Sequence, residues 1–202
     1  MNQLREEQFI SLDMKAPIWN QFYTVAPLAV IGTKEMDEYD LAPKHMITPL
    51  GRENYFGFVC TPKHGTYHNV KKEKVFTVSF PRPNQVILTS LAASPRCGFK
   101  NKMEGIIDNL PTFKSQNIDA LFVKNAYLYL ECELTKIVDG FGEWSLIAGK
   151  ITNAFVSRDS LRISDGDDQQ MIYQAPILAY LPYGRFAEIK DTLAFPYPEG
   201  ME

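Results

Sequence analysis

The sequence has little of three features that define common classes of protein. Its 202 residues include only three cysteines, too few and too scattered for a disulfide framework: Cys60, Cys97 and Cys132. Its 21 basic and 24 acidic side chains leave a formal charge of −3, so no cationic surplus is available to hold nucleic acid or an anionic membrane. No stretch stays apolar long enough to span a bilayer. We therefore expect a cytoplasmic protein that binds neither nucleic acid nor membrane.

Other signals are also missing. Residues 1–15 mix charges of both signs and lack the apolar core of a signal peptide, so we do not expect export by that route. The chain has no internal repeat and no Gly/Ser linker, which favours one domain over residues 1–202. It contains no GxSxG elbow, no P-loop and no GxGxxG fingerprint. Ser-based hydrolysis and kinase chemistry lose support as a result.

What the sequence does contain is a series of short apolar runs separated by turn residues. These runs predict six or seven strands, mostly in hairpin order, over residues 25–33, 41–48, 55–61, 75–80, 127–138, 144–157 and 175–182. The turn of the late hairpin is expected at Asp139–Gly142. Helices are expected from Gly65 and Thr66 to Lys74 and from Pro83 to Ser94, and residues 95–125 are assigned only loosely to short helices and loops. A mainly β fold with helices follows, in which an antiparallel sheet curls into a barrel.

The late strand at residues 127–138 shows the clearest alternation. Leu128, Leu130, Cys132 and Leu134 predict its buried face, and the opposite face carries Glu131 and Glu133. Two carboxylates on such a face are typical of solvated surface rather than of an acid/base pair.

The segment Thr61–Thr66, TPKHGT, lies between a predicted strand and a predicted helix. The free N–H groups of a first helical turn, the Thr66 hydroxyl and the Lys63 ammonium would converge there on a site suited to a phosphate group. The alternative is that Thr66 only caps the helix and that Lys63 points into water.

Cys60, His64 and His68 recur every four residues, a spacing that raises the question of a metal site. Cys60 belongs to a strand and the two histidines to a loop and a helix, so their side chains need not converge. No carboxylate stands at ligand spacing either. We expect no metal, with Cys60 buried and the imidazoles on the surface.

Several motifs in order resemble the flavin reductase-like proteins of the FMN-binding split-barrel fold. The first four are PLAVIGT, DLAPKHMIT, YFGFVCT and KHGTYHNV, in which Lys63, Thr66 and Asn69 match a K-x-x-T-x-x-N pattern. Later in the chain come LECELTKIVD, WSLIAGKI and PILAYLPYGRF. The likeness covers about residues 25–189.

The resemblance implies an antiparallel six-stranded split β-barrel that forms a homodimer and binds FMN near the subunit interface. It places the ring and ribityl chain of the flavin along Ala42, Pro43, Lys44, His45, Met46 and Thr48. The phosphate end would be surrounded by Cys60, Thr61, Lys63, His64 and Thr66. A cation near the pyrimidine edge of the ring would stabilise the reduced flavin, and Lys44 or His45 could supply it.

The activity implied by the resemblance is NAD(P)H-dependent reduction of flavin or a related electron acceptor, with no catalytic residue assigned. Many relatives carry small residues in place of Lys44 and His45, and a histidine in place of Trp144. These departures keep a second hypothesis open, a non-catalytic FMN-binding electron carrier or flavin store. A third is a split barrel that has lost flavin and serves as an interaction subunit.

Overall fold

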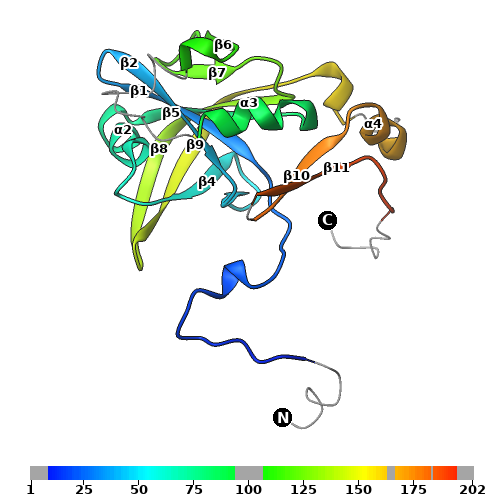
Figure 1. Ribbon diagram of the computed structural model, residues 1–202. Helices are drawn as coiled ribbons and strands as arrows, with labels where there is room; N and C mark the ends of the chain where they lie inside the picture. Colours follow the sequence, from blue (N-terminus) through cyan, green and yellow to red (C-terminus); the bar gives the residue numbers. More distant parts are fainter. Residues whose placement is uncertain (1–8, 94–106, 163–166, 183, 195–202) are drawn as a thin grey trace.

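The computed structural model describes residues 9–93, 107–162, 167–182 and 184–194, and its centre is a seven-stranded sheet. The strands lie in the order β2-β1-β5-β8-β9-β4-β3, and each neighbouring pair is antiparallel. The sheet curls into a half-barrel, with the long β8–β9 hairpin projecting from it (Figure 1). The strands are β1 (Ala29–Glu35), β2 (Glu38–Lys44), β3 (Ile47–Pro49), β4 (Tyr55–Cys60), β5 (Val75–Phe80), β8 (Leu128–Phe141) and β9 (Trp144–Val156).

Helices and two small ribbons surround this sheet. Helix α2 (Gly65–Glu73) packs against β1, β2, β5 and β8, and α3 (Val86–Leu91) and α4 (Asp168–Gln174) lie elsewhere on the periphery (Figure 1). The ribbons are β6 (Thr112–Lys114) with β7 (Leu121–Val123), and β10 (Ile177–Leu181) with β11 (Arg185–Ile189). Single 3₁₀ turns occur at η1 (Ile18–Asn20), η2 (Pro83–Gln85), η3 (Ile107–Asn109) and η4 (Arg158–Ser160). Within the described ranges, no helix has the length and apolar character needed to cross a membrane.

Two apolar clusters lie on opposite faces of the sheet. Because side chains alternate along a strand, Ile31 of β1 packs into the cluster inside the curl and Val30 packs into the cluster outside it. The inner cluster is rich in aromatic residues, such as Phe58 and Phe76, whose rings meet edge to face 5.3 Å apart. The outer cluster is covered by the β6–β7 ribbon.

Gly32 shows how closely β7 approaches the outer face. A Cβ atom at this position would collide with the Leu121 carbonyl oxygen and the Thr77 hydroxyl. The Thr77 hydroxyl donates to that same carbonyl at 2.5 Å, and the Ser79 hydroxyl accepts from the Val123 amide at 3.1 Å. The absence of a side chain at residue 32 is therefore what lets the ribbon dock.

The predicted antiparallel split barrel is confirmed, but the sheet has seven strands rather than six. The run predicted as one strand over residues 41–48 divides into β2 and β3 at His45–Met46, because the chain turns there to pair with β4 as well as β1. The predicted helix from Pro83 begins with η2 and continues as α3 to Leu91. Ser94 and Cys97 lie outside the described residues.

The late hairpin is confirmed, with its turn at a different place. The ladder continues through Asp139 and Gly140 to pair Phe141 with Trp144, so the turn consists of Gly142 and Glu143 instead of Asp139–Gly142. Gly140, with φ of 107°, lies in an irregularity of the ladder between Val138 and Phe141, which lets the strand pass the expected turn.

The prediction for Glu131 is wrong. Glu133 is exposed as expected, but Glu131 is 1% exposed because the loop between β6 and β7 covers it. Its carboxylate accepts hydrogen bonds from the Ser115 hydroxyl, from Asn117 Nδ2 at 2.8 Å and from Asn153 Nδ2 at 2.8 Å. Glu131 thus fastens the β6–β7 ribbon to β8 and β9.

Candidate functional site

The amino-terminal end of α2 is open toward an incoming anion. The residue that precedes the helix, His64, has extended backbone angles, and its side chain does not cap the helix. The first turn contains no acidic residue, whereas Lys71 and Lys72 lie in the last turn, which matches the helix dipole. In the first turn the Tyr67 amide donates to the His64 carbonyl at 3.2 Å, whereas the Gly65 and Thr66 amides have no carbonyl partner within an α-helix. This end therefore offers N–H donors and partial positive charge.

The loop that leads into α2 is folded around Thr61. The Thr61 hydroxyl accepts from the Lys63 amide at 3.3 Å, and the Thr61 carbonyl accepts from the His64 amide at 3.0 Å. Thr61 is buried, whereas Lys63 and His64 are exposed. The loop thus holds the two exposed side chains at the rim of the helix end.

Lys63 already has an anionic partner. Its ammonium lies 2.6 Å from Glu143 Oε1 in the tip of the β8–β9 hairpin, and the two side chains are 68% and 72% exposed. An ion pair this open to water contributes little to stability. A phosphate could therefore replace Glu143 at small cost.

The Thr66 hydroxyl points inward. Thr66 is 2% exposed, and its hydroxyl donates to Asp40 Oδ2 at 3.3 Å, with Asp40 itself buried in β2. Sequence reasoning did not include Asp40, although it shares one face of β2 with Ala42 and Lys44 by strand alternation. In this arrangement the donors that face an anion are backbone amides rather than the Thr66 hydroxyl.

Lys44 lies against Cys60, where β2 and β4 end. Burial raises the pKa of the Cys60 thiol, and the charge and hydrogen bond of the nearby Lys44 ammonium partly oppose that rise. The pKa of His45 is lowered, first by burial and then by the positive charge of Lys44. The His45 ring also contacts the Tyr180 ring of β10, with centroids 5.2 Å apart. Lys44 therefore supplies the positive charge where β2 and β4 end, whereas the lowered pKa of His45 favours its neutral imidazole.

The remaining predicted flavin-binding residues spread along β2 and β3. Ala42 is buried on the same face as Lys44, whereas Pro43 lies on the opposite face of the strand. Met46 is 41% exposed, and its carbonyl accepts from the Val59 amide at 2.9 Å, next to Cys60 in β4. Thr48 is exposed and pairs with Gly57, farther from α2 along β4.

The hairpin is tied to α2 by residues that sequence reasoning missed. Asp139 Oδ1 accepts from the Tyr67 hydroxyl at 3.2 Å and from the Ser145 hydroxyl at 2.6 Å. Burial and the adjacent Asp139 carboxylate raise the pKa of Tyr67. Trp144 follows Glu143 in the tip and is 42% exposed. No local sequence pattern predicts these contacts, which depend on the pairing of β4 with β9.

The spacing of Cys60, His64 and His68 does not bring these side chains into a cluster. Cys60 is buried at the end of β4, and both histidines are exposed. Across the part of the chain that the structure describes, no group of three or more His, Cys, Asp or Glu side chains is placed to hold a metal ion.

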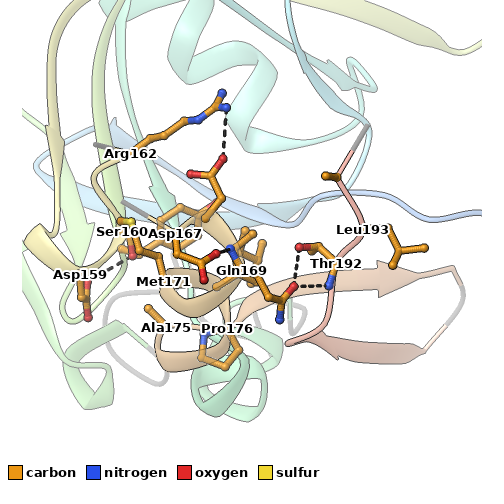
Figure 2. A pocket seen from close by; sticks show the side chains of 15 residues that line it. Asp159, Ser160, Arg162, Asp167, Gln169, Met171, Ala175, Pro176, Thr192 and Leu193 are labelled. Atoms are coloured by element: carbon orange, nitrogen blue, oxygen red, sulfur yellow. Dashed lines mark hydrogen bonds and ion pairs between the residues drawn. The ribbon is translucent and has the colours of Figure 1, made fainter. Parts of the chain in front are cut away.

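A cavity of about 710 Å³ lies between η4, α4, β10 and residues 192–194. Polar side chains of its wall pair with one another (Figure 2). Arg162 contacts Asp168 at 3.2 Å, and Gln169 Oε1 accepts from the Thr192 amide and from the Thr192 hydroxyl, each at 2.7 Å. Figure 1 shows α4 and α2 on opposite sides of the molecule. This cavity is therefore separate from the open end of α2.

The model of the flavin reductase like domain matches residues 23–180. The chain belongs to this family. A comparison with curated proteins found no match.

Several bacterial proteins of known structure share the fold of this flavin reductase-like chain. The 2-nitrobenzoate 2-nitroreductase of Pseudomonas fluorescens is 16% identical, with a TM-score of 0.76 over 96% of this chain and 98% of the other. An FMN-binding protein of Thermus thermophilus, solved with bound 1-cyclohex-2-enone, is 20% identical, with a TM-score of 0.73 over 92% and 99%. The flavoredoxin of Desulfovibrio vulgaris is 17% identical, with a TM-score of 0.72 over 95% and 100%. At these identities the likeness establishes the fold alone.

Proposed function

We propose that this flavin reductase-like protein binds FMN and is an oxidoreductase that uses NADH or NADPH to reduce flavin or a related electron acceptor. The observation that supports the proposal best is the uncapped end of α2, placed where β2 and β4 end. A dianionic phosphate suits exposed amides, the positive end of a helix and an ammonium at the rim. The residues present therefore fit the phosphate end of FMN.

In this proposal the residues near the start of α2 and the ends of β2 and β4 each have a defined role. The amides at the start of α2 bind the phosphate, and Lys63 exchanges Glu143 for it. The flavin, when bound, supplies the hydride and electron transfer chemistry itself. Lys44 provides positive charge beside the ring, because the lowered pKa of His45 favours a neutral imidazole. Trp144 offers an aromatic surface at the hairpin tip.

The fit has one unfavourable element. Asp40 is an acidic residue close to the phosphate end, and its carboxylate accepts from Thr66. The Thr66 hydroxyl donates to this carboxylate and so offsets part of its effect on an incoming anion. We further propose that the protein is a cytoplasmic homodimer.

The direct test is anaerobic mixing of the purified protein with FMN and NADH or NADPH. Absorbance of oxidised flavin at its visible maximum should bleach much faster than in a mixture without protein. Failure to bleach with either nicotinamide would refute the reductase proposal. Replacing Lys63 by Ala should weaken FMN binding in an equilibrium titration, and Lys124→Ala is a matched control far from α2 in sequence.

The second candidate, an FMN-binding electron carrier, is favoured by Trp144, which occupies the position where many relatives have a histidine. Its exposed ring cannot donate or accept a proton as an imidazole does. Sustained, saturable NAD(P)H oxidation would exclude a carrier or store. A colourless protein that also ignores added FMN would favour an interaction subunit instead.

A further inference from the structure

Residues 9–25 form an arm that lies away from the folded body. Figure 1 shows this segment leaving β1 and extending beyond the sheet. None of its residues is buried, and its only regular element is the 3₁₀ turn η1. Yet the arm is rich in large apolar side chains that face water: Phe9, Ile10, Met14, Trp19, Phe22, Tyr23 and Val25.

The apolar surface of the arm is large enough for a stable protein interface. Trp19 is 63% exposed, Tyr23 69% and Phe9 64%. An aromatic side chain has about 150–250 Å² to bury, so each leaves on the order of 100 Å² or more in water. The seven side chains together expose roughly 800 Å², which is about what one partner buries in a standard interface.

The arm has a fixed origin on the body. Ala26 and Tyr180 exchange two backbone hydrogen bonds, at 2.9 and 2.8 Å, which hold the end of the arm against β10. The Tyr180 ring contacts His45 of the candidate flavin site. Within the arm, the Trp19 and Phe22 rings lie 6.0 Å apart. The arm thus presents an ordered aromatic pair, and its origin borders the site.

The charge and shape of the arm favour a protein as its partner. Residues 9–25 carry one acidic and one basic side chain, Asp13 and Lys15, so the arm has no net charge to attract an anionic lipid surface or a nucleic acid. It also lacks a helix long enough to present an amphipathic face. A symmetric pair of arms, each on the other copy, would double the buried surface without requiring a second kind of protein.

We propose that the arm of residues 9–25 packs on a second copy of this chain and holds the homodimer together by reciprocal exchange. The inference rests on the homodimer of the proposed function and adds the element that forms it. Because the arms begin beside His45, the exchanged segments and the two candidate flavin sites share a border.

The test compares the full chain with the variant Trp19→Ser/Phe22→Ser/Tyr23→Ser by sedimentation velocity over a range of concentrations. The dimer dissociation constant should rise by about 100-fold or more, since truncated aromatic anchors dominate interface energies. The control is Ile87→Ser/Leu91→Ser/Leu193→Ser, which removes exposed apolar side chains outside the arm. Any of three results would overturn the inference: an arm variant that dimerises as strongly as the wild type, a control variant whose dimerisation is weakened equally, or a wild-type protein that is monomeric.

A second measurement follows the arm itself. The chain has two tryptophans, so Trp144→Phe leaves Trp19 as the single reporter. Its emission should shift to the blue and acrylamide quenching should fall several-fold as dimers form, whereas a dimer with fully quenchable Trp19 would overturn the inference. Far-ultraviolet circular dichroism checks that each variant is folded. An FMN titration of the wild-type protein, in which Trp144 is intact, separates the two proposals: a wild-type dimer that ignores FMN removes the proposed function and leaves the arm exchange standing.

Discussion

Replacing Glu131 should destabilise the protein strongly, although sequence alone assigns it to the solvent. Glu131 is 1% exposed, and its carboxylate accepts hydrogen bonds from Ser115, Asn117 and Asn153. In Glu131→Ala these donors lose their acceptor in a buried place and the side chain leaves a void. Each buried donor left without an acceptor costs about 1–3 kcal/mol, so the loss over these neutral donors is on the order of 3–5 kcal/mol. For a domain of this size, that corresponds to a fall in Tm on the order of 10 °C.

The substitution Glu131→Gln isolates the electrostatic part of this loss, because it keeps the volume of the side chain. Glutamine replaces one carboxylate oxygen by an NH₂ group, which cannot accept a hydrogen bond. One of the amide or hydroxyl donors that face Glu131 then has no acceptor, which costs about 1–3 kcal/mol. Glu133→Gln is the matched control, since Glu133 lies two residues along the same strand and is exposed.

Urea unfolding followed by circular dichroism measures these differences as changes in the free energy of unfolding. Hydrogen exchange of the Leu121 and Val123 amides reports on the β6–β7 ribbon, which should open more often in both Glu131 variants. If Glu131→Gln and Glu133→Gln were equally stable, the reasoning that Glu131 fastens the ribbon to the sheet would be refuted.

Three further predictions concern the candidate site. Thr66→Val should lower the free energy of unfolding by about 1–3 kcal/mol, because Asp40 loses a buried donor, and Thr66→Ser should restore most of it in urea titrations; equal stability of Val and Thr would contradict the contact. Glu143→Gln should strengthen FMN binding and Lys63→Ala should weaken it, each by up to about 10-fold in a fluorescence titration. Weaker binding by Glu143→Gln or tighter binding by Lys63→Ala would contradict the replacement of Glu143 by phosphate at Lys63. His45 should titrate below 6.5 by NMR, and Lys44→Met should raise its pKa. Because the folded pKa is the lower one, His45 costs stability as the pH falls from 6.5 toward that value, and His45→Phe should remove this part of the pH dependence.

Local patterns were sufficient for most of the sheet. Alternation at residues 127–138 and the run from Trp144 predict the β8–β9 hairpin, and the apolar runs at residues 55–61 and 75–80 predict β4 and β5. The division of residues 41–48 into β2 and β3 was not predictable, since no Gly, Asn or Asp marks the turn at His45–Met46.

The details of the site depended on contacts between distant segments. Glu131 is buried by β6 and β7, whose three-residue strands are too short to show a period. The Thr66 side chain points inward because its hydroxyl donates to Asp40 of β2. The Lys63–Glu143 ion pair forms because the tip of the hairpin docks beside the loop before α2. The position of the open helix end, by contrast, was predictable from TPKHGT, because the change from strand to helix is a local property.

The place of β4 in the sheet has a consequence for synthesis of the chain. In the finished fold β4 pairs with β3 and β9, and Cys60 lies opposite Ser145. At about 5–20 residues per second, a ribosome needs on the order of 10 s to produce β9 after β4. During that interval the nascent chain carries an unsatisfied strand edge with aromatic side chains, so occupancy by chaperones should peak before residue 145 emerges and fall once the hairpin closes.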